Sequence, residues 1–133
     1  MEKREQKFTT TFLKWLRARQ DKGALPHAAV IEIKVAKKGE PLSFSAVKEH
    51  QIHALLVAKW HTFAYKISDL DRLQKPCDVV YMRNTGGLLV FYWSDKTFYV
   101  IDIDVFEQEK ELSKRKSLTE ERAKELAFLI GKI

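Results

Sequence analysis

The chain has 133 residues, of which 45% are hydrophobic and 32% charged, and its formal net charge is +6. A chain of this length can bury a core without metals or disulfides, and the single cysteine, Cys77, excludes a disulfide framework and a cysteine-based zinc site. No apolar run approaches the ~18 residues of a membrane span. We therefore expect one domain over residues 1–133, in the cytoplasm of the cell and not in a membrane.

The positive charge is concentrated in the first part of the chain. Residues 1–38 hold ten Lys or Arg and four acids, while the remaining residues carry equal numbers of each sign. A localised basic segment suggests a polyanionic partner, most simply nucleic acid. The alternative is that these charges only form the solvated face of a helix.

The first half of the chain predicts two helices and two strands. One stripe at helical spacing contains Phe8, Phe12, Trp15, Leu16 and Arg19, and it predicts a helix that ends near Lys22 and Gly23. The Val- and Ile-rich run over residues 28–36 predicts a strand. Ser45 is a candidate N-cap for a second helix that runs to about Trp60, and residues 62–67 predict another strand.

The second half predicts three short strands followed by helices. Residues 78–82, 88–93 and 97–103 are separated by short turns, so we expect an antiparallel meander. A short helix is expected over residues 105–112. A capping-box pattern at residues 117–120 predicts a last helix that closes at Gly131. This order predicts an α/β (α+β) fold with a mixed sheet flanked by helices.

Glu32 and Lys34 lie two residues apart on the first predicted strand. Side chains alternate along a strand, so both should point to the same face of an otherwise apolar segment. An acid and a base in that position require each other or a ligand. The alternative is an ion pair at the edge of a sheet.

Gln51 is the polar member of an apolar helical face. It shares a stripe at helical spacing with four apolar residues: Val47, Ala54, Leu55 and Ala58. An amide in such a position must be hydrogen-bonded. Either the amide bonds to the backbone, or it points to the same place as Glu32 and Lys34.

Several further polar residues are candidates with simpler alternatives. Asp78 opens a predicted strand after Pro76 and can reach a site at the end of the sheet, although a turn or cap role is the simpler interpretation. Asp69 is a weaker candidate in the preceding loop. Asp102 and Asp104 are interpreted as strand-end and N-cap acids. The basic run over residues 114–116 either contacts phosphate or forms a solvated loop.

Three of these segments together resemble a known family. Glu32-Ile33-Lys34, Ser43-Phe44 and Glu49-His50-Gln51 resemble the central block of RecU-type Holliday junction resolvases, which belong to the PD-(D/E)xK nuclease superfamily. The match covers roughly residues 28–60. The whole chain is also similar to small phage- and prophage-encoded nuclease-like proteins, through residues 65–69, 75–78 and 115–119. The resemblance implies a restriction-endonuclease-like mixed sheet.

The resemblance also implies a metal site with an unusual motif order. In the family the Pro-Asp strand precedes Glu-x-Lys, whereas here Pro76-Cys77-Asp78 follows it. We therefore expect a permuted site in which Asp78, Glu32 and the backbone carbonyl of Ile33 hold Mg²⁺ or Mn²⁺. Lys34 would orient the attacking water or stabilise the phosphate, and Gln51 would position water or phosphate. Asp69 is the next candidate if Asp78 is not the second acid.

The function implied is a metal-dependent DNA endonuclease that selects branched DNA, as a Holliday junction resolvase does. The alternatives are a repair or end-processing nuclease, and a non-catalytic DNA-binding module on the same fold. Seven cations are the expected contacts to the DNA backbone: Lys14, Arg17, Lys37, Lys38, Lys75, Arg115 and Lys116.

A homodimer is also expected. Resolving a four-way junction needs two symmetric cuts, and related resolvases are dimers. Tyr92 and Trp93 are adjacent on one predicted strand and must face opposite sides of it. A core on one side cannot cover both, so one of them is a candidate for a twofold interface.

Overall fold

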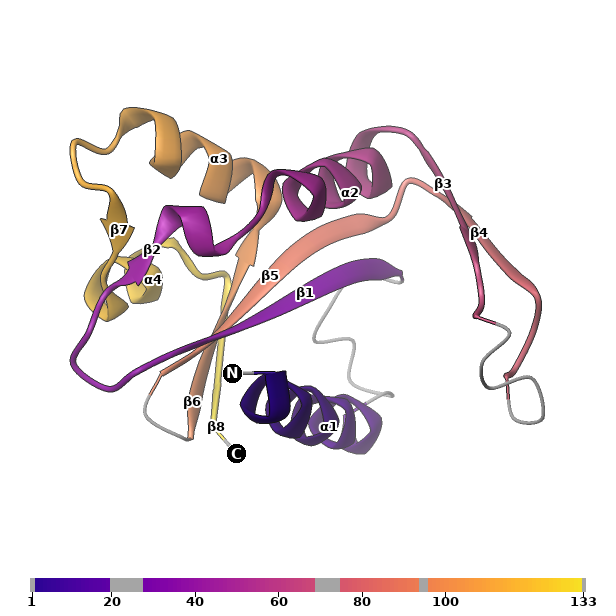
Figure 1. The fold of residues 1–133 in the computed structure, drawn as a ribbon, viewed down its shortest axis with the longest axis horizontal. Coiled ribbons are helices and arrows are strands. Elements are labelled where there is room, and N and C mark those ends of the chain that lie inside the picture. Colours follow the sequence, from indigo (N-terminus) through magenta and orange to yellow (C-terminus); the bar gives the residue numbers. More distant parts are fainter. Residues whose placement is uncertain (1, 20–27, 69–74, 94–95, 133) are drawn as a thin grey trace.

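A four-stranded mixed sheet forms the centre of the fold in a computed structural model that describes residues 2–19, 28–68, 75–93 and 96–132. Strand β1 (Ala29–Ala36) pairs in parallel with β5 (Gly86–Trp93). Strand β6 (Thr97–Asp102) pairs antiparallel with β5, and β8 (Leu129–Lys132) pairs antiparallel with β6. The predicted α/β class, a mixed sheet flanked by helices, is confirmed (Figure 1).

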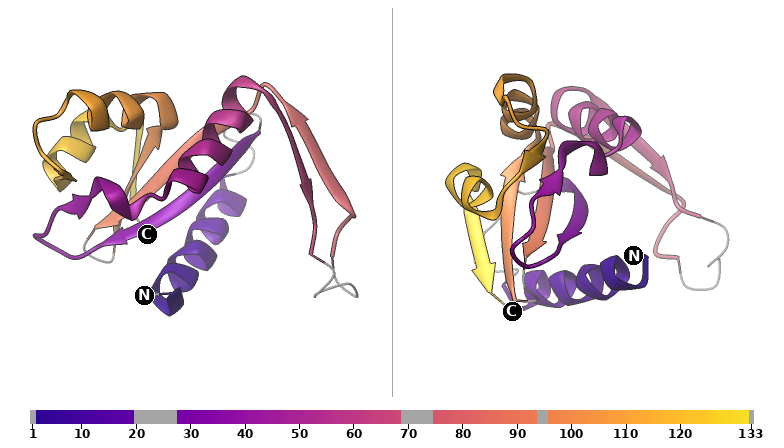
Figure 2. Two further views of the ribbon diagram at one scale, coloured as in Figure 1. Left: turned by 45° about the horizontal axis from the view of Figure 1, so that its top comes forward. Right: turned by 60° about the vertical axis from the view of Figure 1, so that its left-hand side comes forward.

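Helices cover both faces of this sheet. Helix α1 (Glu2–Ala18) lies across one face, while α2 (Glu49–Trp60), α3 (Ile103–Leu112) and α4 (Glu120–Leu126) lie on the other (Figures 1 and 2). A single 3₁₀ turn at Phe44–Ala46 precedes α2. The short strands β2 (Leu42–Ser43) and β7 (Ser117–Leu118) pair beside it.

Strand β5 is buried on both sides. Phe91 and Trp93 pack in the cluster beneath α2 and α3, and Tyr92 packs in the cluster covered by Phe8 and Phe12 of α1. Tyr92 and Trp93 are both fully buried. The core is therefore two-sided, and the expectation that one of these rings is left over for a twofold interface is wrong, because α1 supplies the missing cover.

The predicted meander is only partly correct. Strand β4 (Val79–Arg83) pairs with β3 (Thr62–Lys66) in a separate two-stranded hairpin, and only β5 and β6 form the expected antiparallel pair. Between β4 and β5, Asn84 has a φ of 56° and the hydroxyl of Thr85 donates to the carbonyl of Ala58 at 2.7 Å. These two residues turn the chain at the end of α2, so the hairpin projects away from the sheet (Figures 1 and 2).

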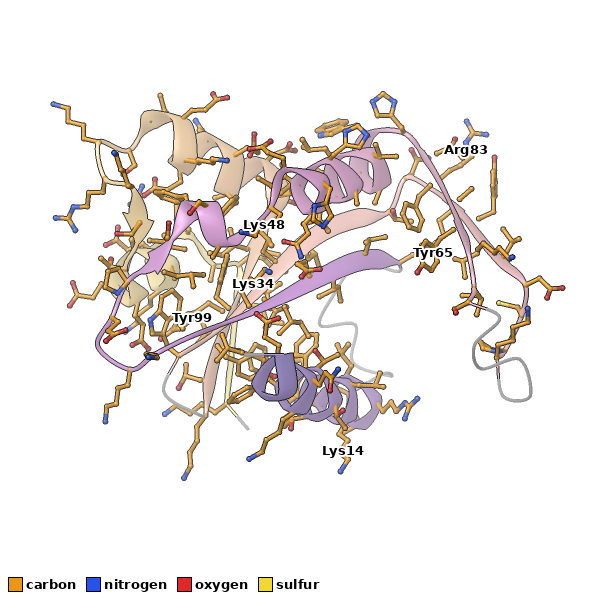
Figure 3. All side chains as sticks on the ribbon, in the orientation of Figure 1. Lys14, Lys34, Lys48, Tyr65, Arg83 and Tyr99 are labelled. Carbon is orange, nitrogen blue, oxygen red and sulfur yellow. The ribbon has the colours of Figure 1, made fainter. Side chains whose placement is uncertain are left out.

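The C-terminal elements also differ from the prediction. Thr119 caps α4 by accepting a hydrogen bond from the Arg122 N–H at 3.1 Å, and the chain continues as strand β8 instead of helix. Gly131 lies in β8, where its missing side chain leaves room for the Phe98 ring. The Tyr99 hydroxyl donates to Glu120 at 2.7 Å (Tyr99 is labelled in Figure 3). Burial and this hydrogen bond raise the pKa of Tyr99 to about 12.

The remaining sequence-based elements agree with the structure. The predicted strands over residues 28–36 and 62–67 correspond to β1 and β3, and the helix over residues 105–112 corresponds to α3. The second helix ends at Trp60 as expected but begins at Glu49, because Ser45 lies in the 3₁₀ turn. The first helix ends at Ala18, before the predicted end near Lys22 and Gly23, and those two residues lie outside the described part of the chain. None of the helices in the described part of the chain is long and apolar enough to cross a membrane.

Gly87 sets the distance between α2 and the sheet. A Cβ built on Gly87 would lie 2.3 Å from the backbone oxygen of Leu55. Because that oxygen belongs to the helix backbone, α2 must move to admit a methyl group. We expect Gly87→Ala to lower the free energy of unfolding by about 2 kcal/mol or more, as measured by urea denaturation. Gly39→Asn is the control, since a Cβ there meets nothing and Asn tolerates its φ of 77°. Equal stabilities of the two variants would contradict this packing.

Candidate active site

Glu32 and Lys34 lie on the face of β1 that is turned toward α2. Their neighbour Ala36 belongs to the core cluster beneath α2, whereas Ile33 and Val35 belong to the cluster covered by α1. The expected alternation along this strand therefore holds. It places an acid and a base together on one side of an apolar strand.

Gln51 of α2 contacts this charged pair on β1. Its amide nitrogen donates to Oε1 of Glu32 at 2.9 Å, and Nζ of Lys34 lies 3.6 Å from the same oxygen. Its own amide oxygen accepts from the Lys48 N–H at 2.9 Å, which orients the amide. The predicted convergence of Glu32, Lys34 and Gln51 is thus present, between α2 and β1 where Lys34 and Lys48 are labelled in Figure 3.

The burial of the pair is unequal. The Lys34 side chain is 11% exposed, whereas that of Glu32 is 31% exposed. The ammonium group is therefore held in a largely dry position with the carboxylate as its counter-charge. The carboxylate keeps one side open to solvent, where it can bind a further cation or a water molecule.

The outer edge of β1 is open next to this carboxylate. The Gly86 N–H donates to the Ala28 carbonyl at 2.8 Å, so the even-numbered residues of β1 bond to β5. In such a ladder the intervening residues direct their backbone groups the other way, so the carbonyls of Ile31 and Ile33 point away from β5. They border a cavity of about 520 Å³ between β1 and α1.

Glu5 of α1 lines the same cavity as Glu32 and Ile33, and it is not among the site residues predicted from the sequence. A signal was present, because Glu5 precedes Phe8 and Phe12 at helical spacing and so shares the face of α1 that packs on the sheet. What the sequence could not supply is the position of α1 along β1. Glu5 and Glu32 are thus lining residues of one cavity at the edge of β1, but they come from opposite sides of the strand, since the Glu32 side chain points to the α2 face and α1 covers the other.

Asp78 lies elsewhere. It precedes β4 at the far end of the projecting hairpin, its side chain is 88% exposed, and it forms an ion pair with Lys75 at 3.1 Å. The permuted-site prediction required β4 to lie in the sheet near β1, but β4 pairs with β3, so the structure does not bring Asp78 to Glu32 (Figure 1). Asp69 lies outside the described residues.

The donors at the β1 edge suit a hard divalent cation. Mg²⁺ is commonly bound through one or two carboxylates and keeps several waters, so it does not need a complete protein cage. Glu32, Glu5 and the Ile33 carbonyl provide oxygen donors of this kind. Among the described residues, no group of three His, Cys, Asp or Glu side chains is placed to hold a metal ion. The described residues therefore form no closed metal site, and a cation at this edge would have to complete its coordination with water.

A second cluster of charges has a structural explanation. Asp102 caps α3 by accepting from the Asp104 N–H at 2.9 Å, and both carboxylates pair with Lys59 of α2. Partial burial opposes the charged form of Lys59, but the hydrogen bonds to Asp102 and Asp104 raise its pKa. The interpretation of Asp102 as a strand-end acid is correct, but the N-cap of α3 is also Asp102; Asp104 lies in the first turn of α3, where it pairs with Lys59 of α2.

The seven predicted DNA-binding cations occupy separate parts of the molecule. Lys14 and Arg17 are exposed on α1, and Lys14 points away from the sheet (Figure 3). Lys37 and Lys38 are exposed in the turn after β1. Lys75 pairs with Asp78 at the end of the hairpin, as described above. The last two, Arg115 and Lys116, border a second cavity between α2 and α3.

Comparison of the chain with protein-family models, with curated proteins and with solved structures finds no match.

The unequal burial of the central pair predicts unequal effects on stability. Glu32→Gln leaves the nearly buried Lys34 ammonium without a counter-charge and should cost about 1–2 kcal/mol in the free energy of unfolding. Lys34→Met removes the buried charge and leaves Glu32 bonded to Gln51, so stability should stay within about 0.5 kcal/mol of the wild type. Urea denaturation of both variants and of the double variant, which should recover the loss, checks this. A larger loss in Lys34→Met than in Glu32→Gln would contradict it.

Proposed function

We propose that the chain is a metal-dependent DNA endonuclease of the PD-(D/E)xK type. The observation that carries this proposal is the convergence of Glu32, Lys34 and Gln51 at the open edge of β1. An acid, a nearly buried ammonium and an oriented amide in one place are the groups that phosphodiester hydrolysis uses. The oxygen donors around the same opening support the metal dependence.

Each residue has a role that follows from its position. Glu32 would hold the cation, and a bound Mg²⁺ or Mn²⁺ would lower the pKa of a water molecule and neutralise charge on the scissile phosphate. Lys34 would stabilise the negative charge that develops on the phosphate, because its ammonium is held away from bulk water. Gln51 would keep the Glu32 carboxylate oriented and help to position the attacking water.

We assign the second acid to Glu5 in preference to Asp78. Glu5 lines the cavity that Glu32 and Ile33 border, whereas Asp78 is exposed and paired with Lys75. Both α1 and β1 would then contribute oxygens to one cation. This assignment keeps the chemistry inferred from the family resemblance and changes the element that completes the site.

The substrate proposed is branched DNA, with cleavage by a homodimer in the cytoplasm of a bacterial or phage-infected cell. The projecting hairpin supports a non-duplex substrate, because Tyr65 and Tyr81 are 57% and 64% exposed there and aromatic rings stack on unpaired bases. Tyr65 is labelled in Figure 3. A repair or end-processing nuclease would share the site and the metal. A non-catalytic binding module would keep the basic surface and lose the metal dependence.

A cleavage panel tests the site. Wild-type protein should cut a four-way junction in Mg²⁺ and not in EDTA, and flap, duplex and single-stranded DNA define the preference. Glu32→Gln, Lys34→Met and Glu5→Gln should each lower the cleavage rate by about a hundredfold or more, because each removes a group that binds the metal or stabilises the phosphate. Binding in EDTA should survive in all three.

Asp78→Asn and Glu111→Gln complete the panel. Asp78→Asn should cleave nearly as the wild type does, and Glu111, which is exposed on α3, provides a matched control for loss of one carboxylate. If Asp78→Asn is inactive and Glu5→Gln is active, the permuted site is the correct one. If all five variants behave alike, the chain is not this nuclease and the binding module becomes the better account.

Salt dependence tests the basic surface of α1 and of the turn after β1. Removing Lys14, Arg17, Lys37 and Lys38 together should flatten the slope of log affinity against log salt by roughly one unit for each phosphate that the protein no longer neutralises. Fluorescence anisotropy with a duplex probe in EDTA measures this slope. A variant lacking Lys96, Lys124 and Lys132, which are exposed elsewhere, should keep the wild-type slope. Equal slopes in all three proteins would show that Lys14, Arg17, Lys37 and Lys38 form only a solvated surface and do not contact DNA.

A further inference from the structure

A second cavity, of about 630 Å³, lies between the start of α2 and the segment that joins α3 to β7. It does not include Glu32, Lys34 or Gln51. Its lining residues come from distant parts of the sequence, and five of them are cationic: Lys48, Lys110, Lys114, Arg115 and Lys116. The fold thus brings Lys48 to the basic run over residues 114–116, for which the sequence alone leaves both phosphate contact and a solvated loop open.

Most cations that line this cavity have no ion-pair partner among the described residues, although Lys114 and Arg115 also line a neighbouring cavity together with glutamates of α3 and α4. Glu49 is its single lining carboxylate, and Glu49 pairs with Lys110 at 3.1 Å. Within the part of the chain that the structure describes, the side chains of the other four cations form no ion pair. Like charges gathered around one opening repel each other, and a bound anion relieves that repulsion.

Hydroxyl groups around the opening can donate to such an anion. Ser113 accepts from the Arg115 N–H at 3.1 Å and keeps its own O–H to donate. The Ser43 and Ser45 hydroxyl oxygens lie 2.8 Å apart, so one proton is shared between them and the other is available. The side chains of Phe44 and Val47 close the cavity with an apolar wall. Hydroxyl donors next to exposed cations form a pattern that suits phosphate oxygens.

We propose that this cavity binds a phosphate group of a nucleic acid strand, separately from the phosphate handled at Glu32. Lys48 connects the two places, because its side chain lines the cavity while its backbone N–H holds the Gln51 amide that bonds to Glu32. A strand anchored here would therefore lie close to the candidate active site. The inference rests on the proposed function only in taking nucleic acid as the source of the phosphate.

Binding measurements on the full chain in EDTA test the proposal. The probes are two single-stranded oligonucleotides of one sequence with a 3′ fluorophore, one with a 5′-phosphate and one with a 5′-hydroxyl. We expect Arg115→Ala/Lys116→Ala to weaken binding roughly tenfold, and Lys48→Ala to weaken it in the same direction. Lys124→Ala/Lys132→Ala removes the same charge from exposed positions outside the cavity and should bind nearly as the wild type does. Inorganic pyrophosphate should compete with the probe for the wild type and less for the cavity variants.

The outcomes are distinguishable. A larger loss with the 5′-phosphorylated probe identifies a terminal phosphate as the ligand, and an equal loss with both probes identifies an internal phosphodiester; both support the proposal. If the cavity variants lose no more affinity than Lys124→Ala/Lys132→Ala, the proposal is overturned. Circular dichroism of each variant checks that these exposed substitutions leave the fold intact. An inactive wild type in Mg²⁺ would overturn the nuclease function without changing this result, because binding is measured without metal.

Discussion

The parallel pairing of β1 with β5 is the constraint on which the rest of the structure depends. Parallel neighbours cannot be joined by a tight turn, so the chain between them must cross over the sheet, and α2 makes that crossing. Since every residue of β5 after Gly86 is buried, both faces of the sheet need cover. Helix α1 supplies the second layer. The contact between Gln51 and Glu32 is a direct result, because the crossing helix lies over the strand it has just left.

The first turn of α2 serves two places at once. Through the Lys48 backbone and Gln51 it fixes the carboxylate on β1, and through the Lys48 side chain it borders the basic cavity. The opposite wall of that cavity is held by α3 and α4, where Arg122 makes two hydrogen bonds to Glu109, at 2.8 and 3.0 Å. These bonds keep the pKa of the Glu109 carboxyl below its usual range. The Arg122–Glu109 pair therefore stabilises the fold at neutral pH, and this stabilisation is lost only as the pH falls through the lowered pKa of Glu109.

Local patterns in the sequence identified the central residues but not all of their neighbours. Alternation on β1 placed Glu32 and Lys34 on one face, and helical spacing placed Gln51 above them. Those inferences need only the geometry of one element at a time. The pairing partner of β4 could not be inferred in this way, because an alternating strand can pair equally well with the strand before it or with the strand after it. The turn at Asn84 and Thr85 decides it through a contact with α2. For the same reason the sequence favoured Asp78, which the structure places at the end of the hairpin, far from Glu32. It did not indicate Glu5, because the proposed role of Glu5 depends on how α1 lies along β1.

The hairpin of β3 and β4 has a consequence for the energetics of the molecule. Its strands pair with each other and with no strand of the central sheet in the described structure, and a lone two-stranded hairpin is only marginally stable in water. Its backbone amides can therefore exchange with solvent through a local opening that leaves the buried sheet intact. Hydrogen exchange should divide the chain into a slowly exchanging unit around β5 and a quickly exchanging one at residues 62–66 and 79–83. A partner that binds the hairpin would slow exchange first at residues 62–66 and 79–83. Exchange at these amides would therefore report binding to the hairpin.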